Sequence, residues 1–291
     1  MAKTVTKSLL DIHPRELKGI IKEIPTLPVI YQELFQKMQE PNISVPQIAE
    51  IISQDQALTV KILHLVNSAF YGYSKEIKTI SRAVVILGFQ AVRSAALAIS
   101  VFDYFNGEDS NQIDMTQFWK HSIATGSICK ILAGEIKINQ QEEAFVVGLL
   151  HDTGKLIEKR YFSEDFNELV EAAQEQHLTW FNAEKALFQI HHATIGKAIF
   201  RAWDFPTSVV DAVQFHHNPD SATKYPQLAA LAHLGDYMAY PLGYPSPGAM
   251  APEGCNPAAL KILGVTLEDC QRMVPKFKED LESSMEILKL V

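Results

Sequence analysis

The sequence predicts an all-α protein, and three observations support this class. Apolar residues recur three or four positions apart along most of the chain, which is the spacing of one helix face. Capping residues and prolines punctuate these apolar segments. No run of alternating apolar and polar residues indicates a half-buried strand, and Gly and Pro number only 14 each among 291 residues.

The first helices are predicted from their caps. Ser44, followed three residues later by Gln47, is typical of a capping box and predicts a helix start. Asp55 is a suitable cap for the next helix. A further helix is predicted to open at Ser81 and to end at Gly88, and a largely buried helix follows it directly.

The second half of the chain continues in the same way. Thr116 is predicted to cap a long helix, and the stretch "EEAFVVGLLHDTGKLIEKRY" predicts another that is interrupted near Gly154. Asn182 is predicted to cap a helix that runs to about Trp203. Pro226 opens the helix "PQLAALAHLGDYMAY".

Two irregular segments predict the division into domains. The polar, turn-rich stretch 106–115 separates two helical lobes, and the Pro/Gly-rich stretch 241–256 precedes a C-terminal helical piece that Pro275 kinks or splits. The predicted parts are an N-terminal lobe at 1–110, a second lobe at 111–240, and a loop with C-terminal helices at 241–291.

Composition argues against several classes of protein. The net charge is −8 with no basic stripe, so we expect no nucleic-acid partner. The longest apolar runs are about seven residues, too short for a membrane span, and the N-terminus lacks the apolar core of a secretory signal. Three cysteines without CxxC spacing fit a reducing compartment. We therefore expect a cytoplasmic protein with no membrane partner.

Several histidines and aspartates stand in apolar helical surroundings, where an unpaired polar group costs roughly 1–3 kcal/mol. Any one of these histidines is best explained as a core or capping residue, but as a set they suggest a metal site. Imidazole and carboxylate ligands together suit Fe, Mn, Zn or Ni, so we expect one or two divalent transition-metal ions. The candidate metal ligands are His121, His151, Asp152, His192, His216, His217 and Asp236.

The order of these residues resembles the HD superfamily of metal-dependent phosphohydrolases, whose minimal motif is His…His-Asp…Asp. Here it reads His121, His151-Asp152 and Asp236, with a lysine in "HDTGK" after the pair. The remaining histidines resemble the two-metal version known from the HD-GYP cyclic-dinucleotide phosphodiesterases. The resemblance implies that Asp152 bridges two metals and that Lys155 neutralises phosphate charge, which makes these two the candidate catalytic residues.

Two further segments resemble the HDOD domain, the HD-related output domain of bacterial signalling. They are "LTVKILHLVNSAFYG" at 58–72 and "DFPTSVVDAVQFHHNP" at 204–219, and the resemblance runs from about residue 20 to 240. It implies a two-lobed helical HDOD fold with an HD-like helical bundle. The "GYP" tripeptide of the HD-GYP enzymes follows the paired histidines, whereas here it stands at 243–245, beyond Asp236, which argues against cyclic-di-GMP hydrolysis.

Two functions remain open. The first is a signal-transduction output module that binds a signalling partner protein, with a metal or nucleotide as its switch. The alternative is a metal-dependent phosphohydrolase acting on a nucleotide or cyclic dinucleotide. The N-terminal lobe carries no cluster of catalytic groups and favours the first, whereas the nearly complete ligand set favours the second.

Overall fold

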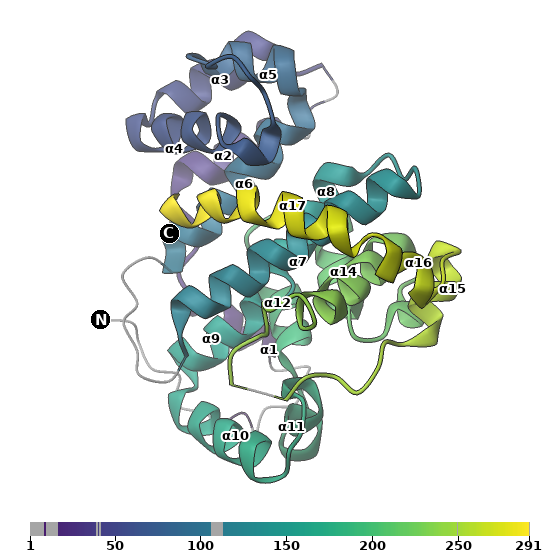
Figure 1. Ribbon diagram of the computed structural model, residues 1–291. Helices are drawn as coiled ribbons and strands as arrows, with labels where there is room; N and C mark the ends of the chain where they lie inside the picture. The colour runs from purple at the N-terminus through teal and green to yellow at the C-terminus, as the bar shows by residue number, and fades with distance from the viewer. Residues whose placement is uncertain are drawn as a thin grey trace.

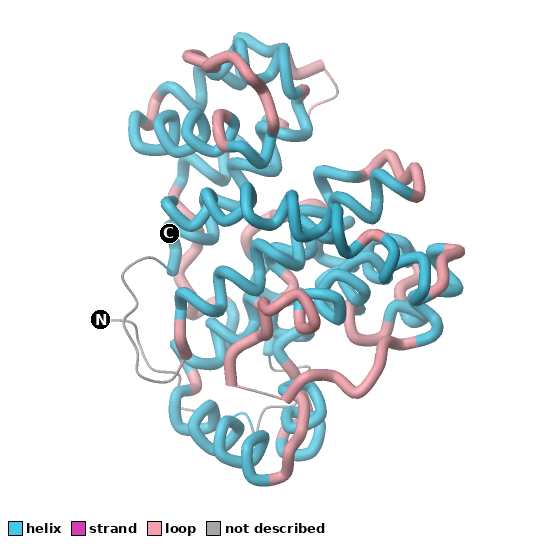
Figure 2. The backbone as a smooth tube through the Cα atoms, viewed as in Figure 1, coloured by secondary structure: helices cyan, strands magenta, loops and turns pink. Residues whose placement is uncertain are grey.

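The part of the chain that the computed structural model describes folds entirely into helices and connecting loops (Figure 1). The structure describes residues 9, 17–38, 40, 42–105, 113–248 and 250–290. No strand occurs in these ranges (Figure 2), so the prediction of an all-α fold is confirmed. None of the described helices is long and apolar enough to cross a membrane.

A first group of helices forms the upper part of Figure 1, where α3 contacts α2, α4 and α5, and α6 leads down into the rest of the molecule. The members of this group are α2 (Val29–Lys37), α3 (Val45–Ser53), α4 (Gln56–Val66), η2 (Ala69–Tyr71), α5 (Ile80–Leu87) and α6 (Phe89–Phe105). The predicted capping box is confirmed, with the Ser44 amide donating to Gln47 Oε1 at 2.9 Å. Asp55 Oδ1 caps α4 by accepting from the Leu58 amide.

A second group surrounds the long helix α7, which packs against α8 and α14. Its members are α7 (Met115–Glu135), α8 (Gln141–Leu150), α9 (Thr153–Tyr161), α10 (Ser163–Glu175), α11 (Trp180–Leu187), α12 (His192–Ala202), α13 (Thr207–Phe215), η3 (Pro219–Ser221) and α14 (Pro226–Ala239). Helices α7 and α8 approach closely, because a Cβ at Gly148 would lie 2.8 Å from Gly126 Cα. The short α1 (Leu17–Ile21) joins this group through α12.

The C-terminal helices lie across both groups. They are α15 (Pro257–Leu263), α16 (Leu267–Arg272), α17 (Val274–Ser284) and η4 (Met285–Leu290). Helix α17, yellow in Figure 1, packs on α7 and η2, and η4 contacts α7 and α4. The predicted split near Pro275 is confirmed, but it falls at Met273, because proline is favoured within the first turn of a helix rather than at its end.

Three predicted helix boundaries are wrong. Helix α5 is capped by Thr79 rather than Ser81, and α7 by Asp114 rather than Thr116, each cap accepting from the amide three residues later. The helix predicted from Asn182 to Trp203 is two helices, since α11 ends at Leu187 and α12 begins at His192. The predicted boundary at 106–115 lies largely outside the described residues.

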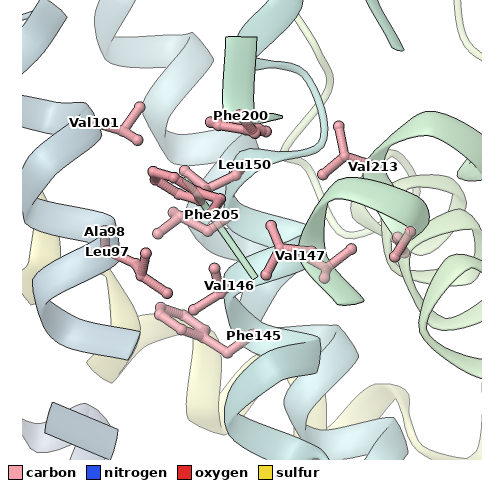
Figure 3. Close-up of a cluster of buried hydrophobic side chains, with 14 of the residues drawn as sticks. Leu97, Ala98, Val101, Phe145, Val146, Val147, Leu150, Phe200, Phe205 and Val213 are labelled. Carbon is pink, nitrogen blue, oxygen red and sulfur yellow. The ribbon is translucent and has the colours of Figure 1, made fainter. Parts of the chain in front are cut away.

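One apolar core joins the two groups (Figure 3). Leu97 and Val101 of α6 meet Phe145 and Leu150 of α8, and Phe205 after α12 fills the space between them. Each such buried side chain contributes roughly 1.5–3 kcal/mol to stability. The core therefore fixes the position of α8, whose end carries the first residues of the candidate site.

Candidate metal centre

The pair His151-Asp152 lies at a break between two helices. His151 is the C-cap residue that directly follows α8, and Asp152 precedes the first turn of α9. The helix was predicted to be interrupted near Gly154, but the break is at the pair itself. Gly154 has another role, because a Cβ there would lie 1.9 Å from the His192 carbonyl oxygen. Only glycine lets the first turns of α9 and α12 touch, which brings Asp152 beside His192.

One group of candidate ligands surrounds the His151-Asp152 pair. His121 comes from α7 and Asp236 from α14, and His121 Nε2 lies 3.3 Å from Asp236 Oδ1. His151 Nε2 lies 3.4 Å from Asp152 Oδ1 and 3.9 Å from Asp236 Oδ1. Ligand atoms of His121, His151 and Asp152 all lie within 4.8 Å of one another.

A second group consists of three histidines. His192 begins α12, and His216 and His217 follow the last turn of α13. His192 Nε2 lies 3.3 Å from His216 Nε2 and 3.0 Å from His217 Nε2. Asp152 joins the two groups, because its Oδ1 lies 3.3 Å from His192 Nε2 and its Oδ2 lies 3.7 Å from His121 Nε2. The structure therefore brings all seven predicted ligands together.

Four of the five imidazole rings share one orientation, with Nδ1 bound to the protein and Nε2 facing the centre; they belong to His121, His151, His192 and His216. Nδ1 donates to a backbone carbonyl in three cases, His121 to Tyr244 (2.8 Å), His151 to Gly148 (2.7 Å) and His216 to Val213 (2.7 Å). This arrangement is typical of metal-binding histidines, whose second nitrogen is oriented by a hydrogen bond.

Several inward-facing nitrogens either lack a hydrogen-bond partner or face another lone pair. His121 Nε2 and His151 Nε2 are buried with no partner in the described residues. His192 and His216 each donate from Nδ1, so their Nε2 lone pairs face each other at 3.3 Å. Such an arrangement is unfavourable unless a cation lies between the lone pairs. The donor set thus fits a divalent metal.

Charge at the centre also suits a cation. Burial lowers the pKa of His151 and His216, and it lowers the pKa of His192 to about 3, so these rings are in the neutral, metal-binding form. Burial favours a higher pKa for Asp152, but positive charge beside the carboxyl group, of which the Lys155 ammonium supplies the permanent part, holds that pKa well below its usual range. Asp152 is therefore a carboxylate beside neutral imidazoles.

Lys155, the other candidate catalytic residue, lies in the first turn of α9 and is only 4% exposed. Its Nζ donates to Asp152 Oδ2 at 2.6 Å and to Ser246 Oγ at 3.1 Å, and it lies 5.5 Å from the centre of the Trp180 ring. One positive charge is thus held at the edge of the centre.

Two residues with roles at the centre were not predicted. Glu184 of α11 accepts hydrogen bonds from both the amide and Nδ1 of His192, at 2.8 and 2.7 Å. Glu184 is paired with a second buried carboxyl group, Glu158. Burial raises the pKa of both groups, that of Glu184 to about 8, but their mutual interaction raises the pKa of Glu158 and lowers that of Glu184, so the shared proton lies on Glu158. A carboxylate among apolar neighbours was the only signal in the sequence.

The remaining nearby histidines are oriented differently. His233 donates from Nδ1 to the His216 carbonyl and accepts at Nε2 from the Asn256 amide. It therefore supports a candidate ligand. His191 Nε2 lies 3.3 Å from Thr194 Oγ1, and His191 belongs to neither group.

A small cavity of about 70 Å³ opens beside the centre. Lys155, His217 and Asp236 line it, together with the aromatic rings of Trp180 and Tyr240. Phe181 also lines it and stacks on the His217 ring, with centroids 4.2 Å apart.

Comparisons with known proteins agree with this architecture. An HDOD domain protein of unknown function from Geobacter sulfurreducens superposes with a TM-score of 0.76 at 22% identity, over 93% of this chain and 96% of that one. A Shewanella amazonensis protein, provisionally named a phosphohydrolase, superposes with a TM-score of 0.74 at 24% identity, over 96% of this chain and 99% of that one.

Curated sequence relatives match over shorter stretches. The cyclic di-GMP phosphodiesterase CdgJ of Vibrio cholerae is 24% identical over 122 residues, which are 42% of this chain and 27% of that protein. This chain spans 40% or less of the length of the curated relatives that it matches. The HDOD domain family matches residues 24–219, about two thirds of the sequence. The chain therefore belongs to the HDOD family, as its resemblance to that family implied.

Proposed function

We propose that this chain is a cytoplasmic signal-transduction output module that holds one or two divalent transition-metal ions and acts by binding a signalling partner protein. Membership of the HDOD family supports the signalling role. The observation that supports a bound metal is the set of buried histidine Nε2 atoms that face one another or have no hydrogen-bond partner. We assign the metal-binding part to 111–240, between an N-terminal lobe at 1–110 and the C-terminal part at 241–291.

The ligands divide naturally between two ions. His121, His151 and Asp236 would hold the first, and His192, His216 and His217 the second, with Asp152 shared between them. A shared carboxylate suits this position, because it supplies negative charge that neutral imidazoles lack. Five imidazole nitrogens together with two carboxylates as ligands favour Fe, Mn, Zn or Ni.

Partner binding is supported by the distribution of polar groups. Both groups of candidate ligands among the described residues lie between 121 and 236. Helices α2 to α5 contribute no residue to either group, yet they form a packed unit attached through α6. Such a unit has no evident use in chemistry at the centre and is available for a protein partner. No nucleic-acid or membrane partner is proposed.

The alternative is a metal-dependent phosphohydrolase acting on a nucleotide or cyclic dinucleotide. The observation that favours it is Lys155, whose ammonium lines the cavity beside the ligands and can offset phosphate charge. A metal at this site would lower the pKa of a bound water and so supply a nucleophile. The names of the Shewanella and Vibrio relatives favour the same reading. The misplaced "GYP" at 243–245 and the size of the cavity speak against a cyclic dinucleotide.

Metal content and turnover separate the two readings. Elemental analysis of the purified chain, with anomalous scattering to locate the ions, is expected to give one or two ions per chain. The chain loaded with Fe, Mn, Zn or Ni is then assayed on nucleotides and cyclic dinucleotides. Bound metal without turnover supports the output module, and turnover that follows metal content supports the hydrolase. A chain that takes up none of these metals contradicts both.

A further inference from the structure

Residues 243–248, here called the cover segment, run directly over the candidate metal centre. The Tyr244 carbonyl accepts from His121 Nδ1 at 2.8 Å. Two residues later, the Ser246 hydroxyl donates to Asp152 Oδ2 at 3.0 Å and accepts from Lys155 Nζ at 3.1 Å. The Ser246 side chain belongs to a loop 94 positions from Asp152 in the sequence, yet it is only 3% exposed.

The far end of the cover segment packs against an aromatic ring. Gly248 has φ +84°, a conformation that favours glycine, and a Cβ there would lie 3.0 Å from Trp180 Cζ3. The same Trp180 ring lies beside the Lys155 ammonium. The segment is therefore anchored at both ends, on His121 and on Trp180, with Ser246 inserted between them.

This arrangement leaves little room for a ligand. The cavity at the centre has about 70 Å³, whereas sites for small molecules usually have about 300–1,000 Å³. Lys155 has three donors, and Asp152 and Ser246 already accept from it. A phosphate oxygen would make a stronger, charge-assisted bond to Lys155 than the neutral Ser246 hydroxyl does.

We propose that the cover segment is an internal inhibitor of the centre, in which Ser246 Oγ stands where a phosphate oxygen of a ligand would contact Lys155. A phosphate group must displace Ser246, and anything larger also requires the segment to lift. The inference deepens the proposed function and rests on its metal centre. It also identifies how a partner could control the centre, by holding the segment open or closed.

Hydrogen exchange of the segment tests its anchoring without any metal. In S246A the amides at positions 243, 244, 246 and 248, the four positions of the segment that are not proline, are expected to exchange at least fivefold faster than in the wild type. The matched control is M250A, in the same loop, because Met250 is 47% exposed and is not among the residues that line the cavity beside the centre. Exchange in S246A equal to that in the wild type and M250A would overturn the proposal.

Two further measurements test access to the centre. Inorganic phosphate is expected to increase exchange of the segment in the wild-type protein, and an absence of any increase would overturn the role of Ser246 as a substitute for phosphate. Metal release from the loaded protein to a chelator is expected to be several-fold faster in S246A than in M250A. Faster exchange with unchanged release would show that the segment does not gate the centre. If no metal binds at all, the proposed function fails. The hydrogen-exchange and phosphate results still show whether Ser246 anchors the cover segment and whether phosphate displaces it.

Discussion

Glu184 holds His192 at two points, with one carboxylate oxygen 2.8 Å from the His192 amide and the other 2.7 Å from Nδ1. Both residues are fully buried, so water does not replace either bond. The carboxylate therefore fixes the ring, the tautomer and the start of α12 together, and it leaves His192 Nε2 free to face Asp152 and the paired histidines.

Replacing this carboxylate is expected to weaken metal binding while preserving the fold. In Glu184→Gln the amide group has one oxygen and cannot accept both bonds from His192, so the ring loses its fixed orientation. Loss of such an orienting partner typically costs 10–100-fold in metal affinity. Metal titration measures this, with Glu171→Gln on the exposed face of α10 as the matched control. Equal affinities in the two variants would contradict the role of Glu184.

Comparing two aspartates tests whether Asp152 is shared between ions. Asp152→Asn is expected to lose all bound metal, because the residue borders both ligand groups. Asp236→Asn is expected to lose only the ion beside His121, since Asp236 contacts His121 and His151 alone among the imidazoles. Elemental analysis of both folded variants gives the result. Unchanged metal content in Asp152→Asn would remove that residue from the ligands.

Acidification is expected to destabilise the metal-free protein, because the buried imidazoles outnumber the two buried carboxyl groups, Glu158 and Glu184, whose raised pKa values act in the opposite direction. The pKa values of His151, His192 and His216 are lowered by burial, that of His192 to about 3, so below about pH 6.5 the unfolded chain binds protons that the folded chain does not. The free energy of unfolding then falls with decreasing pH, by up to about 1.4 kcal/mol per pH unit for each imidazole. Urea unfolding between pH 7.5 and 5.5 measures this slope, and a flat profile would contradict neutral buried rings.

Metal removal is expected to lower the melting temperature at pH 7. An ion that binds only the native state stabilises it by about 2.7 kcal/mol when its free concentration is 100 times Kd. For a chain of this size each kcal/mol corresponds to roughly 2–4 °C. Calorimetry before and after chelation measures the shift, and Asp152→Asn provides the control, because chelation should leave its melting temperature unchanged.

The sequence allowed the helical class and the seven candidate ligands to be predicted, but not how the ligands meet. Periodicity and caps specify helices locally, as at Asp55, and errors arose where two polar residues compete for one cap, as Thr79 and Ser81 do. The break at His151-Asp152 carries no glycine or proline signal, because both residues keep negative φ values near the helical region. Ser246 reaches Asp152 from 94 positions away, and only tertiary packing determines such a contact.

Gly154 should be the most sensitive glycine of the chain, because it sets the contact between α9 and α12. A Cβ at this position would lie 1.9 Å from the His192 carbonyl oxygen and 2.6 Å from its carbonyl carbon, and backbone atoms cannot move aside as a flexible side chain can. Gly154→Ala must therefore push the two first turns apart, separating Asp152 and Lys155 from His192. We expect a loss of several kcal/mol in the free energy of unfolding and loss of metal binding.

Gly134→Ala on α7 is the matched control. A Cβ at Gly134 would meet only the Gln141 side chain, at 3.6 Å or more. Alanine also has the higher helix propensity, so this substitution should stabilise the chain by up to about 1 kcal/mol. Chemical denaturation and metal titration of both variants measure the difference. If the Gly154→Ala protein is as stable as the Gly134→Ala protein and binds as much metal, close contact between the first turns of α9 and α12 is not what assembles the centre.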